Sequence, residues 1–148
     1  MLAWIGRTVV IGAIVCTGLP VSAQTCVPLP VVGGTGTEVR KTISIPSIGP
    51  LARSNWDTGF TVSGGPYSNY VARITPRSEG NYAVQLNLKY SNNLVDKVFD
   101  ENVELTRKQP LKITVPPRSS ENPVQIDLSV GGGEVVGNTY TLSVEGCR

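Results

Sequence analysis

The sequence predicts an all-β fold: a single-domain antiparallel β-sandwich of immunoglobulin-like architecture, with about eight short strands. Two observations lead to this prediction. Apolar and polar residues alternate over short stretches along most of the chain, and Gly, Pro, Asn or Asp stands between nearly all of these stretches. No stretch has the apolar stripe of a long amphipathic helix. Short strands at such regular spacing are typical of two packed sheets.

The clearest strand is predicted at residues 81–90, where the alternation has no interruption. One face carries apolar or aromatic side chains: Tyr82, Val84, Leu86, Leu88 and Tyr90. A period of two is that of a strand with one buried face and one face in water. We therefore expect an interior strand here, with Leu86 in the core and Gln85 outside.

The other strands follow from the same alternation. They are expected at residues 38–46, 56–63, 69–75, 111–115, 124–130 and 139–145. Residues 94–105 are less regular and predict two short strands broken at 100–102. A single short helix is the alternative, which the lack of an apolar stripe disfavours. The short turn at 77–80 favours a hairpin between strands 69–75 and 81–90. Residues 27–37, rich in Pro and Gly, are expected to be irregular or to form an edge strand.

Residues 1–23 have the features of a secretory signal peptide. Arg7 is their only charge, an apolar run covers residues 9–19, and small residues precede a cleavage position after Ala23. We therefore expect residues 24–148 to form the domain, in a secreted or periplasmic protein with no membrane span after processing. The alternative is a lipoprotein anchored through Cys16, which Val15 disfavours because lipoprotein signals place a small residue there.

Two cysteines, Cys26 and Cys147, remain after the signal peptide is removed. Because an exported protein meets an oxidising environment, we expect them to form one disulfide that joins the two ends of the domain. A reactive thiol pair is the alternative. It is disfavoured because neither cysteine belongs to a C-x-x-C motif or lies beside a histidine.

The composition excludes several kinds of chemistry. The chain has 0 histidines, which removes Ser-His-Asp and Cys-His catalysis and the commonest zinc sites. No P-loop is present, and Gly131-Gly132-Gly133 follows a strand without a helix pattern after it. Asp100, Glu101 and Glu104 lack the spacing of a calcium loop and are expected in a solvated turn. We expect no catalytic residue, metal or cofactor, and the near-neutral net charge gives no case for nucleic acid.

Aromatic residues suggest a ligand-binding surface at residues 56–70. Trp56, Tyr67 and Tyr70, with Arg73 beside them, give the mixture of planar rings and polar groups that carbohydrate-binding sandwiches use. Core packing is the favoured interpretation, because Trp56 shares its parity with Phe60, and Tyr70 with Ala72 and Ile74, which points both rings toward the core. Tyr67 is expected to be the freest of the three rings.

Basic residues recur along the chain, and two roles are open for them. They could receive an acidic partner along one sheet edge, or protect edge strands from pairing with other chains. They stand at Arg40-Lys41, Arg107-Lys108, Lys112 and Arg118.

These features together predict a non-enzymatic module that binds another protein or contributes to an assembly in the envelope or the extracellular matrix. A carbohydrate-binding module that uses the 56–70 region is the alternative, with a glycan as its partner. A small hydrolase that works through carboxylates is a third candidate, since paired carboxylates meet only in the fold.

Cleavage after Ala23 is testable by mass spectrometry. The intact mass of the secreted protein is expected to correspond to a chain that begins at Gln24. A mass that retains Met1, or a lipid adduct on Cys16, would contradict the signal-peptide prediction.

Overall fold

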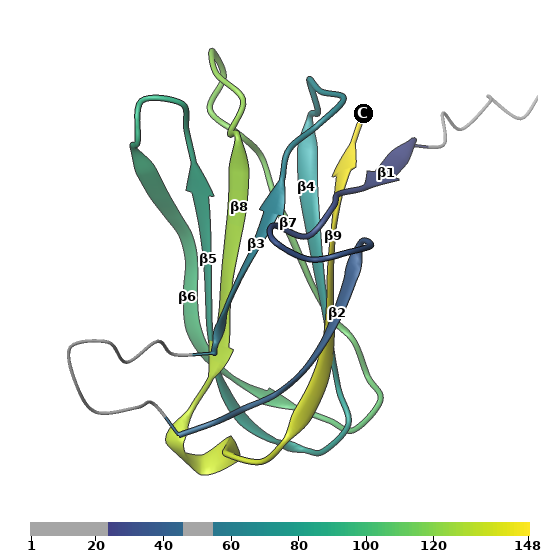
Figure 1. Ribbon diagram of the computed structural model, residues 1–148, viewed down its shortest axis with the longest axis vertical. Helices are drawn as coiled ribbons and strands as arrows, with labels where there is room; N and C mark the ends of the chain where they lie inside the picture. The colour runs from purple at the N-terminus through teal and green to yellow at the C-terminus, as the bar shows by residue number, and fades with distance from the viewer. Residues whose placement is uncertain (1–23, 46–54) are drawn as a thin grey trace, which may run out of the picture.

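The computed structural model describes residues 24–45 and 55–148. The predicted signal peptide, residues 1–23, and the connector at 46–54 lie outside the described residues. Two antiparallel sheets pack face to face, with β5, β6 and β8 on the left in Figure 1 and β4 and β9 on the right. The predicted fold class, an all-β antiparallel sandwich, is confirmed; the described residues form nine strands.

The first sheet has the order β1-β9-β4-β7, and β2 also pairs with β9. Its strands are β1 (Cys26–Pro28), β2 (Glu38–Thr42), β4 (Asn69–Pro76), β7 (Leu111–Val115) and β9 (Thr139–Cys147). β1 and β2 occupy successive parts of one side of β9, opposite residues 145–147 and 139–143. The Pro- and Gly-rich residues between them interrupt what would otherwise be one long edge strand.

The second sheet has the order β3-β8-β5-β6. Its strands are β3 (Asp57–Thr61), β5 (Gly80–Lys89), β6 (Val95–Leu105) and β8 (Gln125–Gly131). A short 3-10 helix, η1 (Gly133–Val135), follows β8 at the lower end of the sandwich (Figure 1). Among the described residues, no helix has the length and apolar character needed to cross a membrane.

The predicted hairpin between residues 69–75 and 81–90 is wrong. β4 belongs to the first sheet and β5 to the second, so residues 77–79 carry the chain from one sheet to the other. The hairpin partner of β5 is β6. Alternation shows which face of a strand is buried, but two strands that face each other across a core have the same pattern as two neighbours in one sheet.

The predicted break at 100–102 is also wrong, since residues 95–105 form one continuous strand, β6. Its register against β5 shifts between Leu86 and Asn87, where β6 has one extra residue. Such a bulge reverses the parity of the side chains that follow it, which obscures the alternation in the sequence. Asp100, Glu101 and Glu104 therefore lie in a strand and not in a turn.

The core lies between the two sheets and takes one face of each strand. β5 is interior to its sheet, between β8 and β6, and its five predicted inward side chains are all buried. They pack with the inward residues of β4 and β9, among them Ile74, Leu142 and Val144. Leu86 is 1% exposed, whereas its neighbour Gln85 is partly exposed on the opposite face.

The predicted disulfide is confirmed. Cys26 and Cys147 are joined at the paired ends of β1 and β9, with a sequence separation of 121. Thr25 and Arg148 extend the pairing by one more bond, in which the Arg148 N–H donates to the carbonyl of Thr25 at 2.9 Å. The crosslink therefore holds the first and last strands of the domain together.

Leu86 and Gln85 provide a matched test of the register of β5. Leu86→Ala is expected to lower the free energy of unfolding by about 2–5 kcal/mol, because it leaves a cavity in the core. Gln85→Ala is expected to cost no more than about 0.5 kcal/mol, because the side chain lies on the outer face. Denaturant titration of both variants measures the difference; equal losses at the two positions would contradict the two-layer arrangement.

Candidate functional site

The outer face of the second sheet is polar. Interior strands β5 and β8 point amide, hydroxyl and carboxyl groups outward: Asn81, Gln85, Asn87, Gln125, Asp127 and Ser129. Such groups donate and accept hydrogen bonds without placing a large net charge on the surface. Two of the amide oxygens, those of Asn81 and Asn87, are buried and have no hydrogen-bond partner among the described residues. Unpaired buried polar atoms are uncommon in folded proteins, which marks this face as unusual.

Trp56 lies at the margin of this face, in the turn before β3. Its backbone carbonyl accepts a hydrogen bond from the Val130 N–H at 3.0 Å, and its Nε1–H donates to the Ser44 carbonyl at 2.8 Å. The ring covers Gly131, where an added Cβ would lie 2.1 Å from Trp56 Cδ2. Because Gly131 pairs with Ala83, whose side chain points away from the core, the ring covers the outer face of the sheet.

This position differs from the one that the alternation predicted. Trp56 is partly buried and packs at the margin of the core, but it does not share the inward face of Phe60. Residues 55–56 form a turn, and the regular alternation of β3 begins only at Asp57. The side chain of Trp56 therefore does not have to point to the same face of the sheet as that of Phe60.

A hollow of about 390 Å³ lies beside the ring of Trp56. Its other lining residues come from β5, β6 and the turn after β8: Asn81, Ala83, Asn102, Gly132, Gly133 and Glu134. The hollow thus has one aromatic wall, two amides and one carboxylate. A small number of polar groups around an apolar wall is the usual composition of a small-molecule site.

The two predicted tyrosines are inside the protein. Tyr67 and Tyr70 are 3% and 1% exposed, and their ring centroids are 5.8 Å apart in an edge-to-face arrangement. The Tyr67 ring covers Gly146, and its hydroxyl donates to the Ser63 carbonyl at 2.5 Å. Burial, with smaller contributions from the neighbouring tyrosines, raises the pKa of Tyr70 to about 12. The expectation that Tyr67 is the freest of the three rings is therefore wrong.

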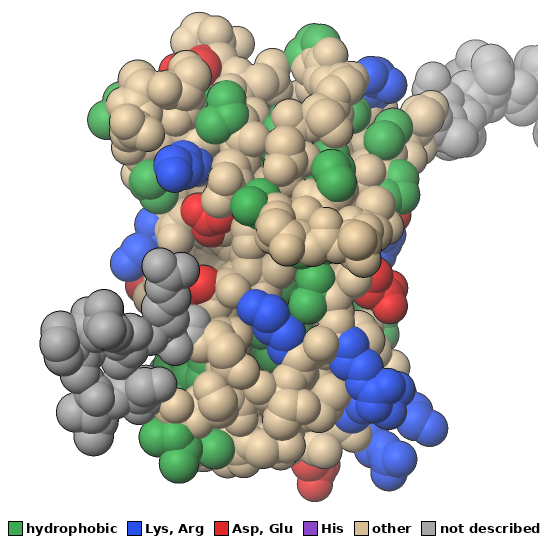
Figure 2. Space-filling model, viewed as in Figure 1, with side chains coloured by type: hydrophobic (Ala, Val, Ile, Leu, Met, Phe, Trp, Pro, Cys, Tyr) green, Lys and Arg blue, Asp and Glu red, His purple; other side chains and the backbone are tan. Residues whose placement is uncertain are grey.

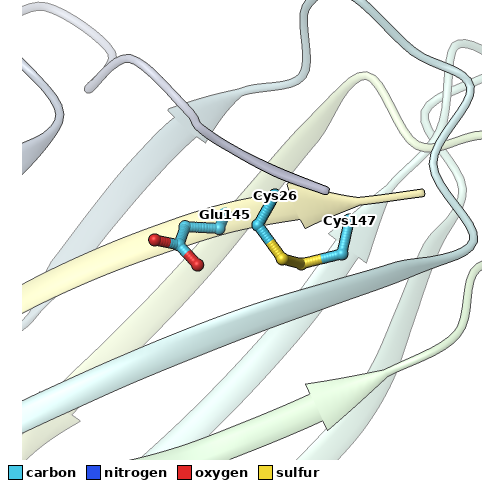
Figure 3. Close-up of side chains that lie close together, drawn as sticks. All are labelled: Cys26, Glu145 and Cys147. Atoms are coloured by element: carbon cyan, nitrogen blue, oxygen red, sulfur yellow. A yellow bond between two sulfur atoms is a disulfide. The ribbon is translucent and has the colours of Figure 1, made fainter. Parts of the chain in front are cut away.

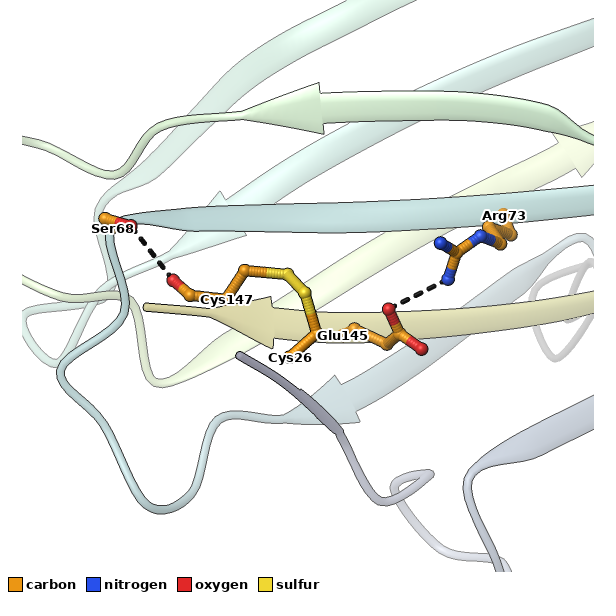
Figure 4. Close-up of a disulfide and its surroundings, with 5 residues drawn as sticks. All are labelled: Cys26, Ser68, Arg73, Glu145 and Cys147. Atoms are coloured by element: carbon orange, nitrogen blue, oxygen red, sulfur yellow. Dashed lines mark hydrogen bonds and ion pairs between the residues drawn. A yellow bond between two sulfur atoms is a disulfide. The ribbon is translucent and has the colours of Figure 1, made fainter. Parts of the chain in front are cut away.

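Arg73 is on the outer face of the first sheet. Its guanidinium binds the Glu145 carboxylate across β4 and β9 at 2.8 Å (Figure 4). The four residues proposed from sequence therefore do not converge: Trp56 is on one outer face, Arg73 on the other, and the two tyrosines lie between the sheets.

Glu145 also lies close to Cys26 and Cys147, as Figure 3 shows. The sulfur atoms of these cysteines are bonded to each other. A thiolate is the form of cysteine that binds metals, so this cluster does not offer a metal site while the disulfide is intact. The Cys147 carbonyl accepts a hydrogen bond from the Ser68 hydroxyl at 3.1 Å (Figure 4).

Sequence reasoning missed Asn81, Asn102 and Glu134 as candidate binding residues. Asn81 carried a signal that was visible in the sequence: three of the outward positions of residues 81–90 hold amides, and asparagine is depleted in strands. Asn102 and Glu134 carried none, because only the fold brings β6 and η1 beside that strand.

Comparison with known proteins gives structural matches only. No protein-family model and no curated protein matches the sequence. Two matching structures are variants of a family 29 carbohydrate-binding module, with 9% identity and TM-scores of 0.46 and 0.47; each match covers 84% of this chain and 91% or 92% of the other. A CBM4 structure matches with 16% identity and a TM-score of 0.37, over 84% of this chain and 92% of the other.

These matches correct the expected function. The sequence favours a module for protein binding or assembly, whereas the matching structures are carbohydrate-binding modules, which is the alternative interpretation. At this degree of similarity the matches identify no binding residue in this chain. The proposal below therefore rests on the chain's own residues.

The contact between Trp56 and Gly131 can be tested with two glycine variants. Gly131→Ala is expected to displace the Trp56 ring and to lower the free energy of unfolding by about 1–3 kcal/mol, because the added methyl overlaps the ring. Gly133→Ala is the matched control, because an added Cβ there meets nothing within 4 Å. Denaturant titration and the emission maximum of Trp56 measure both effects. An unchanged emission maximum in Gly131→Ala would contradict the placement of the ring.

Proposed function

We propose that the protein is a non-catalytic carbohydrate-binding module that binds an oligosaccharide on the outer face of its second sheet. One observation carries this proposal: Trp56 forms an aromatic wall on that face beside a hollow that contains Asn81, Asn102 and Glu134. The site replaces the 56–70 region that the sequence suggested, and it retains only Trp56 from it.

The chemistry of the hollow suits a sugar ring. A pyranose has an apolar face of C–H groups and a rim of hydroxyls. The indole ring offers a flat apolar surface for that face. The amides of Asn81 and Asn102 and the carboxylate of Glu134 offer donors and acceptors to the hydroxyls. A hydroxyl that reached the unpaired Oδ1 of Asn81 would satisfy a buried acceptor.

The aromatic wall is held in place before any ligand binds. Trp56 is fixed at its carbonyl, at its indole N–H and by contact with Gly131, so the ring has little freedom to lose on binding. A site that is already ordered gains affinity because less conformational entropy is lost. The site also lies at the sheet margin, so a longer chain could extend across the polar face towards Gln85 and Asn87.

A binding role without catalysis agrees with the placement of the acidic residues on β6. Asp100 and Glu104 pair with Gln85 and Asn81, whereas Glu101 pairs with Val84 and points to the opposite face of the strand. These three carboxylates therefore do not converge on one sugar bond, as a glycosidase pair must. We further propose that the disulfide-linked domain acts outside the cytoplasm, where such a crosslink persists.

The proposal can be tested by the fluorescence of the protein itself. Trp56 is the one tryptophan in residues 24–148. An array of neutral oligosaccharides is expected to identify at least one ligand, and that ligand should change the emission of Trp56 in a saturable way. The absence of any binding oligosaccharide would contradict the proposal.

Two further variants separate the site from a general effect on folding. Trp56→Ala is expected to reduce affinity for the identified ligand by about tenfold or more, as aromatic anchors do. Asn102→Ala, on an exposed position of β6, should weaken binding without loss of stability. Glu38→Gln is the control, because Glu38 is exposed on the first sheet. Equal affinities in all three variants would place the ligand elsewhere.

A further inference from the structure

A second hollow, of about 510 Å³, lies on the opposite side of the sandwich, at the end of the first sheet. It is lined by residues from β4, β9 and the two turns that follow β4 and β6: Thr75, Pro76, Arg77, Arg107, Lys108 and Thr141. Three of these side chains are cations, two carry hydroxyls, and none is acidic. The composition is that of a site for an anionic group.

Backbone hydrogen bonds hold the two turns to each other and to the start of β9. The Lys108 N–H donates to the Pro76 carbonyl at 2.9 Å, and the Arg77 N–H donates to the Thr139 carbonyl at 2.9 Å. Lys108 has a φ of 64°, a conformation that a residue other than glycine adopts infrequently. Thr75 and Thr141 are direct cross-strand partners on the outer face of the sheet. The hollow is therefore built by the fold, although its cations are exposed.

The cations of the hollow are not neutralised. None of Arg77, Arg107 and Lys108 makes an ion pair with another residue in the part of the chain that the structure describes. Arg40 on β2 is the cross-strand partner of Thr141, and Lys112 lies on β7, the strand beside β4. The surface around the hollow therefore adds positive charge. Figure 2 shows Lys and Arg side chains gathered at the lower right, where these turns lie.

No acidic side chain lines the hollow, although Glu79 lies in the same turn as Arg77. On the first sheet, Glu145 is bound by Arg73, and Glu38 pairs with Ser143, one row away from the hollow. The outer face of the second sheet carries Asp57, Asp100, Glu104 and Asp127 alongside two lysines. The near-neutral net charge of the chain therefore conceals an uneven distribution, and an anionic ligand would be attracted to the first sheet.

Protection of edge strands does not account for this cluster. Lys112 lies on the edge strand β7, where a lysine discourages pairing with another chain. Arg77, Arg107 and Lys108 lie in turns, which present no row of unpaired backbone groups. Arg118, which the sequence grouped with Arg107-Lys108, does not line the hollow. It binds Asp96 with two hydrogen bonds of 2.7 Å and lies over the ring of Tyr90.

We propose that this hollow is a second binding site, for the sulfate ester or carboxylate group of an acidic polysaccharide. The guanidinium groups of Arg77 and Arg107 match the paired oxygens of either anion, and Lys108 adds a point charge. The hydroxyls of Thr75 and Thr141 lie where they can bond to the sugar hydroxyls beside the charged group. The volume is within the range of small-molecule sites and exceeds the needs of a lone ion.

This inference goes beyond the proposed function, because the site lies on the other sheet and does not use Trp56. The test measures binding of the secreted protein to dextran sulfate, polygalacturonate and neutral dextran by calorimetry at low ionic strength. We expect binding to dextran sulfate, to polygalacturonate or to both, at an affinity above that for dextran. The polymer that binds identifies the anion as sulfate or carboxylate. Binding to neither would overturn the proposal.

A matched pair of double variants separates a site from a general effect of charge. Arg77→Gln with Lys108→Gln is expected to reduce affinity for the anionic polymer by about tenfold or more. Lys89→Gln with Lys97→Gln removes the same charge from the second sheet and is expected to have less than about a twofold effect. Glutamine at position 108 meets the same backbone constraint as lysine, so the turn should be retained. Equal losses in the two double variants would overturn the proposal.

Two more measurements distinguish this hollow from the Trp56 site and a polysaccharide from a lipid surface. The Trp56→Ala variant should retain its affinity for the anionic polymer. A loss of that affinity would show that the polymer binds in the hollow beside Trp56 and would overturn the proposal. Failure of the neutral-glycan proposal would leave this result unchanged. Vesicles that contain phosphatidylserine should bind more weakly than the polymer does. Vesicles that bind as tightly as the polymer, and that lose the same affinity in the double variant Arg77→Gln with Lys108→Gln, would show that the ligand is a lipid surface and would overturn the polysaccharide proposal.

Discussion

The two sheets pack against each other through their apolar faces, and this packing stabilises the fold. Each Val, Leu, Ile or Phe side chain that is fully buried in this interior contributes about 1.5–3 kcal/mol. β5 places four large side chains there and Tyr90, directly after it, adds a fifth, opposite those of β4 and β9. Because neighbouring residues in a strand point to opposite faces, burial of one set fixes the direction of every other side chain. The polar face of the second sheet and the basic face of the first are consequences of this burial.

β9 connects this interior to the ends of the chain. It pairs with β4 on one side and with both β1 and β2 on the other. The disulfide between Cys26 and Cys147 closes a loop with a sequence separation of 121. The chain-entropy model assigns about 4–5 kcal/mol to a loop of this size, as an upper figure. The N-terminal strand is short and partly exposed, so this covalent link compensates for the small area that β1 can bury.

Two aromatic rings, those of Trp56 and Tyr67, lie against glycine residues that have no side chain to exclude them. Gly131 is on the outward side of β8, and the absence of a side chain allows the Trp56 ring to lie against the sheet from outside. Gly146 is on the inward side of β9, and the Tyr67 ring occupies the space beside it in the core. Gly131 thus allows the Trp56 ring to lie beside a surface hollow, whereas Gly146 allows the Tyr67 ring to be buried in the core. The separation explains why the aromatic cluster in the sequence does not form one site.

Most of the secondary structure and the crosslink of this protein could be predicted from the sequence. Alternation of residues identified nearly every strand and the buried face of β5, because a period of two is a local property of the chain. The two cysteines of the expected mature chain could pair only with each other. The placement of β4 and β5 in different sheets could not be predicted, since alternation is the same for facing and neighbouring strands. The same holds for the hollow that Trp56 shares with Asn81 and Asn102 and for the one that Arg77 shares with Lys108, because turns and strands far apart in sequence line them.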